Sequence, residues 1–209
     1  MARGSSGIKM PTEFEEALNQ SFFKRLFVSE RKQIAIMADE KSPLRNKSLR
    51  NGVNMQINTK WFGTVEINDA KVITFEKGLI GFEDCSRFAI VYETEDKKEK
   101  PIMWLQSLDE QALALPIIKP EYIVDEYAPD VEDELVYKLG ENVKSDDLMI
   151  FVTMTVPSDL TKMTCNLKAP IIINTATMKA VQAVAANEDY VVRFPVYNLL
   201  KERKEKAGE

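Results

Sequence analysis

Residues 150–184 read IFVTMTVPSDLTKMTCNLKAPIIINTATMKAVQAV, and this stretch decides the fold class. Short runs rich in Ile, Val, Thr and Phe are separated by segments that contain Pro, Ser, Asp and Lys. β-branched and aromatic residues favour strands, whereas the separating residues favour turns. The stretch therefore predicts several short, consecutive β-strands.

The same pattern of short β-rich runs separated by turn residues extends back to Met55 and forward to Val196. Many short strands at this spacing are typical of an antiparallel barrel or sandwich. We therefore expect a mainly β fold, a small antiparallel β-barrel-like domain with one or two short helices over residues 55–209. The other strand-like runs are 55–67, 71–76, 87–93, 101–108, 112–118, 148–156 and 190–196.

One helix is predicted among the strands. The segment PDVEDELVYKLGENV, residues 129–143, has acidic residues where a first turn would form. Its apolar residues Val131, Leu135 and Leu139 share one face, and Gly140 follows as a stop signal. A short amphipathic helix is expected there.

Residues 1–54 differ in kind from the rest. The opening MARGSSG resembles an expression tag. A helix is predicted over 12–38, because Thr12 and Glu15 form a capping-box pattern ahead of phenylalanine and leucine at four-residue spacing. Residues 40–52 are polar, basic and broken by proline and glycine, which is typical of a linker. We expect this helical and linker extension to be extraneous to the main domain.

Composition excludes much catalytic chemistry. The sequence contains no histidine, so Ser-His-Asp and Cys-His mechanisms and histidine-ligated zinc are absent. Cys85 and Cys165 stand alone, which predicts two free buried thiols, with a structural disulfide as the alternative. Gly78-Leu79-Ile80-Gly81 lacks the remaining residues of a phosphate loop, so we interpret it as a tight turn. We expect no enzyme activity, no cofactor and no metal.

Charge is divided unevenly along the chain. Residues 1–54 carry 10 basic and 6 acidic residues, a net of +4, and residues 55–209 carry 18 and 27, a net of −9. An acidic domain argues against direct nucleic-acid binding and suits a basic protein partner. The chain also lacks a run of about 18 apolar residues and a secretion signal, so we expect a cytoplasmic protein without a membrane span.

Five blocks of sequence, in this order, are similar to the FliW family. They are INTKWFGTVEI (57–67), VITFEKGLIGFED (72–84), WLQSLD (104–109), the stretch 150–184 and YVVRFPV (190–196). The resemblance covers nearly the whole of residues 55–209. Ile80 stands where the family commonly has proline, and Phe194 stands where it commonly has histidine, so the family does not depend on that histidine for chemistry.

The resemblance implies a function by partner switching. Proteins similar to FliW bind newly made flagellin in the cytoplasm, and when flagellin is exported they bind the RNA-binding regulator CsrA instead, which stops CsrA from repressing flagellin translation. We expect such a protein to act as a monomer. The alternative is a β-barrel protein that encloses a small ligand, which would require a cavity.

The candidate partner-binding residues fall into three groups, and a structural role stays open for those in strands. Phe82, Glu83 and Asp84 follow the glycine turn, where an exposed aromatic beside acids could anchor a basic partner. Segment 121–134 contains seven acids and no base, and it is expected to speed the approach of CsrA. Its candidates are Asp130, Glu132, Asp133 and Glu134; the family-like blocks add Trp104, Gln106, Asn166, Lys168 and Asn174.

Overall fold

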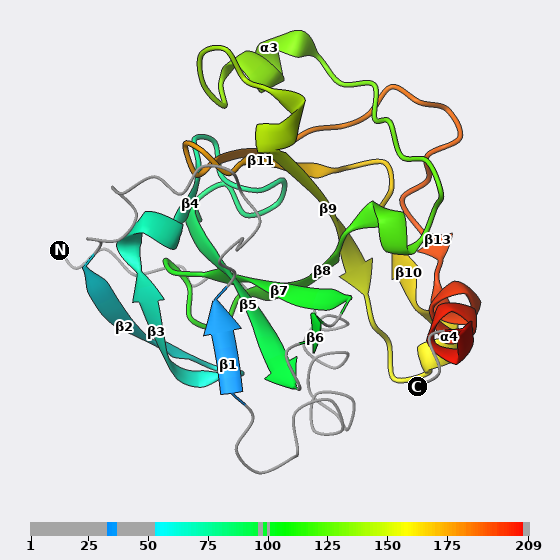
Figure 1. Ribbon diagram of the computed structural model, residues 1–209, viewed down its shortest axis with the longest axis horizontal. Coiled ribbons are helices and arrows are strands. Elements are labelled where there is room, and N and C mark those ends of the chain that lie inside the picture. The colour runs from blue at the N-terminus through cyan, green and yellow to red at the C-terminus, as the bar shows by residue number, and fades with distance from the viewer. Residues whose placement is uncertain (1–32, 37–52, 96–97, 100, 207–209) are drawn as a thin grey trace, which may run out of the picture.

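The computed structural model describes residues 33–36, 53–95, 98–99 and 101–206 (Figure 1). Seven strands close into a barrel, because the β11 end of the sheet pairs with β9 as well as with β12. The predicted mainly β barrel is therefore confirmed. In spatial order the seven are β4 (Ile73–Phe75), β5 (Arg87–Glu95), β7 (Ile102–Ser107), β8 (Ala114–Ile118), β9 (Leu148–Thr155), β11 (Ile171–Asn174) and β12 (Lys179–Gln182).

The barrel departs from a purely antiparallel arrangement at one seam. Strands β12 and β4 pair in parallel, with Lys179 opposite Thr74 and Ala180 opposite Phe75. An odd number of strands cannot alternate in direction all the way around a closed ring, so one neighbouring pair must run in parallel. Beside this seam the Thr74 N–H donates to the Met178 carbonyl at 2.8 Å.

Side chains fill the centre of the barrel. Along β5 and β7, Phe88, Ile90 and Leu105 point inward, as the alternation of a strand requires. Phe75 and Phe88 meet edge to face, with ring centroids 5.2 Å apart. The small-ligand alternative would need a cavity among these side chains, and it stays a prediction. The interior also holds Ile73, Leu79, Cys85, Met103, Leu113, Leu115, Ile117, Phe151, Ile171, Ile173 and Ala180.

A hairpin of β2 (Asn54–Thr59) and β3 (Gly63–Asn68) covers one outer face of the barrel (Figure 1). Its Phe62 packs against Trp104 of β7, with ring centroids 5.9 Å apart. Because this part of the barrel wall is covered on both sides, β7 and β8 are apolar without alternation. Trp104 is consequently a core residue.

A third apolar cluster lies on the outer face of β9, around Val152 and Met154. It is covered by η3 (Pro120–Tyr122), β10 (Thr164–Cys165), β13 (Phe194–Pro195) and α4 (Tyr197–Lys206). Cys165 belongs to this cluster and Cys85 to the barrel interior, and both are buried and free, as predicted. Burial raises the pKa of the Cys165 thiol to about 12.

The remaining short elements lie in the connections. The helix predicted at 129–143 forms only as α3 (Asp133–Tyr137), and Leu139 just beyond it is buried. Neither α3 nor α4, the two α-helices in the described part of the chain, has the length and hydrophobicity to cross a membrane. The other elements are η2 (Asp69–Lys71), β6 (Lys98–Glu99), η4 (Ser145–Asp147) and η5 (Leu160–Lys162).

Two sequence-based predictions are wrong. Within the helix predicted over 12–38, β1 (Gln33–Ile36) is a strand that pairs antiparallel with β5. Alternating β-branched residues suit a strand, and the edge of β5 supplies hydrogen-bond partners. The rest of 12–38 and the linker lie outside the described residues, and the division at residue 54 stays a prediction. In the run 190–196, only Phe194–Pro195 forms a strand, because residues 190–193 are a loop.

Candidate partner-binding surface

The glycine turn forms as predicted. Gly78 and Gly81 have φ angles of +70° and +87°, which favour glycine. The Phe82 N–H donates to the Leu79 carbonyl at 2.8 Å, which closes the turn. A Cβ atom at Gly78 would lie 2.6 Å from the carbonyl oxygen of Glu83, so the chain packs directly on this glycine.

The turn presents its charges and hides its aromatic ring. Glu83 and Asp84 are exposed, whereas Phe82 is partly buried against the barrel interior. Glu83 Oε1 accepts a hydrogen bond from the Gly81 N–H at 2.9 Å, and backbone hydrogen bonds lower the pKa of Glu83. The apolar side chain that the turn exposes is Ile80, at 57%. Phe82 is thus less available as an anchor than the sequence suggests.

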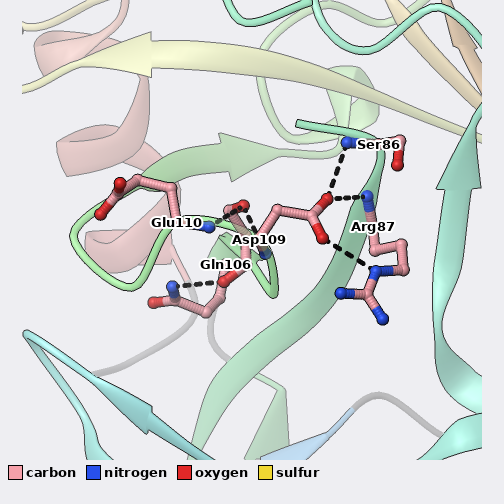
Figure 2. Close-up of polar contacts among 6 residues, drawn as sticks. Ser86, Arg87, Gln106, Asp109 and Glu110 are labelled. Atoms are coloured by element: carbon pink, nitrogen blue, oxygen red, sulfur yellow. Dashed lines mark hydrogen bonds and ion pairs between the residues drawn. The ribbon is translucent and has the colours of Figure 1, made fainter. Parts of the chain in front are cut away.

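A carboxylate clamp fixes the chain that follows the turn (Figure 2). Asp109 Oδ2 accepts from the N–H groups of Ser86 and Arg87, both at 2.8 Å, and Oδ1 accepts from Arg87 Nε at 2.8 Å. Burial by itself would raise the pKa of Asp109. The hydrogen bonds from Arg87 and Ser86 outweigh burial and lower this pKa below its usual value of 3.8. Asp109 therefore ties the WLQSLD block to the chain just after the turn.

Gln106 and Trp104 are internal. Trp104 is 3% exposed and Gln106 is fully buried. Gln106 Nε2 donates to the carbonyls of Ser107 and Leu113, at 2.8 and 3.1 Å. Ser107 Oγ accepts from the N–H groups of Asp109 and Glu110. These contacts shape the turn from β7 to β8 that carries the clamp, so both predicted residues support the surface from inside.

The acidic segment, residues 121–134, forms a second exposed region. All seven of its carboxylate residues are exposed. Its middle is held by a stacked pair of rings, Tyr127 and Tyr190, with centroids 4.7 Å apart and planes at 13°. The Tyr127 hydroxyl donates to the Leu167 carbonyl at 2.6 Å, and Tyr190 Oη accepts from the Ala128 N–H at 2.8 Å. Burial raises the pKa of Tyr127.

Asn187 adds a second tie to this segment. Its Nδ2 donates to the Ala128 carbonyl at 3.1 Å, and its Oδ1 accepts from the Asp130 N–H at 2.7 Å. The ammonium group of Lys168 donates to the Asn187 carbonyl at 2.7 Å. Asn166 Oδ1 accepts from the Ala169 N–H at 3.0 Å and shapes the turn around Lys168. Lys168 and Asn166 therefore act from behind the surface.

Asn174 holds the end of the acidic segment to the barrel. This buried side chain donates through Nδ2 to the Leu139 carbonyl, at 3.2 Å, just beyond α3. On α3, Glu134 forms an ion pair with Lys138 at 3.0 Å. The hydrogen bond and charge of Lys138 lower the pKa of Glu134, and Lys77 contributes.

The predicted residues thus divide by position. Residues that sequence reasoning missed are Asp109, Tyr127, Tyr190 and Asn187, whose partners lie far away along the chain. Within the described ranges, no group of three or more Cys, Asp or Glu is placed to hold a metal ion. The exposed predicted residues are Glu83, Asp84, Asp130, Glu132, Asp133 and Glu134; those partly or fully buried are Phe82, Trp104, Gln106, Asn166, Lys168 and Asn174.

Fold and surface together define a closed β-barrel scaffold that presents fixed, acidic loops. The protein-family model described as FliW protein matches residues 56–196 of this chain. Flagellar assembly factor FliW of Lachnoclostridium phytofermentans is 51% identical over 156 residues, covering 74% of this chain and 99% of the relative. Flagellar assembly factor FliW of Lachnospira eligens is 48% identical over 150 residues, covering 72% of this chain and 99% of the relative. The chain belongs to the FliW family of flagellar assembly factors.

A solved structure agrees with this assignment. The crystal structure of the flagellar assembly factor FliW matches with a TM-score of 0.61 at 27% sequence identity. The match covers 68% of this chain and 97% of the solved one. The barrel described above is therefore a family fold.

Proposed function

We propose that this protein is a cytoplasmic regulator of flagellin synthesis that works by partner switching. It binds newly made flagellin, and when flagellin is exported it binds CsrA and relieves repression of flagellin translation. Membership of a family of flagellar assembly factors supports the setting. The single observation that carries the CsrA part is the acidic segment, because its exposed carboxylates are held on a fixed backbone.

The charge of the acidic segment acts on the approach of a partner and on the exclusion of RNA. Segment 121–134 places seven acids and no base on one stretch of a domain with a net charge of −9. Such a field attracts a basic RNA-binding protein and disfavours RNA phosphates. Because ring stacking and hydrogen bonds already order the segment, binding loses less conformational entropy there. No catalytic group is required.

The test is the association rate with purified CsrA. Asp130, Glu132, Asp133 and Glu134 are replaced by Asn and Gln, and stopped-flow traces are recorded across a salt series. We expect association to slow several-fold, with a weaker salt dependence. The matched control neutralises four exposed acids elsewhere, Glu66, Asp69, Glu76 and Asp146, with the same change in net charge. A rate indifferent to salt and to both sets would contradict the steering role.

Partner switching makes a second requirement. Flagellin and CsrA should bind in a mutually exclusive manner, so that a mixture of all three proteins yields only binary complexes on a sizing column. A stable ternary complex would contradict the switch, although the family assignment would stand.

A further inference from the structure

Two consecutive valines are exposed next to the acidic segment. The run 190–196 predicts a strand, in which alternate side chains would be buried, yet the structure leaves Val191 44% and Val192 59% exposed. Single exposed apolar residues are ordinary on protein surfaces. Two in succession, in a loop fixed on both sides, form a small exposed apolar site.

The loop that carries these valines is rigid by its contacts. The Leu167 N–H donates to the Val191 carbonyl at 3.1 Å. On one side Tyr190 stacks on Tyr127, and on the other Phe194 pairs with Cys165 between β13 and β10. A partner that docks on Val191 and Val192 would therefore meet a preformed surface.

Acidic residues precede the valines in the loop and occupy the segment to which the loop is bound. Because Tyr190 and Asn187 bind the middle of the acidic segment, its carboxylates lie beside the loop. Bases are also present: Lys168 donates to the Asn187 carbonyl, Arg203 lies 3.6 Å from Asp125, and exposed Arg193 follows the valines in the loop. The exposed acids of the loop are Glu188 and Asp189, and those in the middle of the segment bound to it are Asp125, Glu126 and Asp130.

We propose that Val191 and Val192 are the apolar anchor of a docking surface for a basic protein segment, with these five carboxylates as its charged rim. The inference rests on the proposed function, because it takes CsrA as the basic partner, and it places the anchor here instead of at Phe82. The pattern follows the usual anatomy of interfaces, in which a small apolar centre resists dissociation and surrounding charges speed encounter. An acidic rim also disfavours anionic lipid and nucleic acid as occupants.

The experiment uses the full chain and purified CsrA. The double variant Val191→Asn, Val192→Asn should dissociate from CsrA about tenfold faster or more, with little change in association rate. The double variant Glu188→Gln, Asp189→Asn should do the reverse and mainly slow association. Val53→Asn is the matched control, because Val53 is 72% exposed and lies beside the hairpin; its kinetics should equal those of the unmodified protein.

The outcomes separate this surface from the proposed function. Wild-type dissociation of the valine variant would overturn the surface and leave the function standing. Failure of the unmodified protein to bind CsrA would overturn both. Hydrogen exchange of the unmodified complex gives a readout independent of any variant's folding. New protection of the backbone amides of residues 188–193 supports the surface, and protection confined to other loops overturns it.

Discussion

The glycine turn and the acidic segment both present carboxylates, but they are held in different ways. Behind the turn, one ionised side chain, Asp109, accepts three hydrogen bonds from Ser86 and Arg87. The acidic segment is held by stacked tyrosine rings and by two neutral hydrogen bonds, one that Asn187 donates and one that it accepts. A charged clamp is stronger and depends on pH, whereas neutral ties are weaker and do not.

Gly78 should give the largest effect, because the turn has no room for a side chain there. A Cβ would meet three backbone atoms of Phe82 and Glu83 at 2.6–2.7 Å, so we expect Gly78→Ala to lower the free energy of unfolding by about 3 kcal/mol or more. Gly81→Ala is the matched control, since a Cβ there meets nothing within 4 Å. It should cost only about 1 kcal/mol, from its positive φ. Equal losses in urea unfolding would show that the close approach at Gly78 is unimportant.

Removing the charged clamp comes next. Asp109→Ala should destabilise the protein by about 2 kcal/mol, because three donors lose a charged acceptor. The neighbouring Glu110→Ala should cost less, since Glu110 Oε1 accepts from the Ala112 N–H at 3.1 Å on an exposed turn. Urea unfolding of both variants checks the difference. A loss in Asp109→Ala no larger than in Glu110→Ala would mean that the clamp contributes little.

The clamp also predicts a pH dependence. The folded protein lowers the pKa of Asp109 below 3.8, so its contribution is fully present above that pH and is lost as pH falls through the folded-state pKa. In Asp109→Asn the free energy of unfolding should therefore fall less steeply as the pH is lowered from about pH 6 to about pH 3. The exposed acids Glu83 and Glu134 are screened by solvent, so they should contribute less to this pH dependence of the free energy of unfolding. If Asp109→Asn loses stability with falling pH as steeply as the unmodified protein, Asp109 is not a source of this pH dependence.

The neutral ties should give the smallest global effect. Asn187→Ala should cost about 1 kcal/mol, with the same loss at neutral and acidic pH, because no ionised group is removed. Hydrogen exchange should show faster opening of the Asp130 amide, whose acceptor is lost. Tyr190→Phe keeps the ring and removes the acceptor of the Ala128 N–H, so it should act more weakly. A loss that grows with acidification would show that the segment is held by charge after all.

The sequence predicts the strands well and the site only in part. Short runs such as 148–156 predict β9 because β-branched residues favour a strand wherever it packs. The glycine turn is equally local, since a positive φ needs glycine. The seven acids of 121–134 are visible in the composition itself. These features depend on neighbours in the chain, so the amino-acid order is sufficient to determine them.

Tertiary structure decided the rest, because the partners concerned lie far apart in sequence. The amide of Gln106 and the ring of Trp104 are buried because the hairpin and the β7–β8 turn cover them. Asp109 finds Ser86 and Arg87 across the sheet, and Tyr127 meets Tyr190 only when the segment folds back. Val191 and Val192 stay exposed because the contacts that fix the loop are made by the Val191 carbonyl and by the flanking side chains Tyr190 and Phe194. Composition specifies a tendency to form a strand or a charge, but only packing decides which groups meet and which face the solvent.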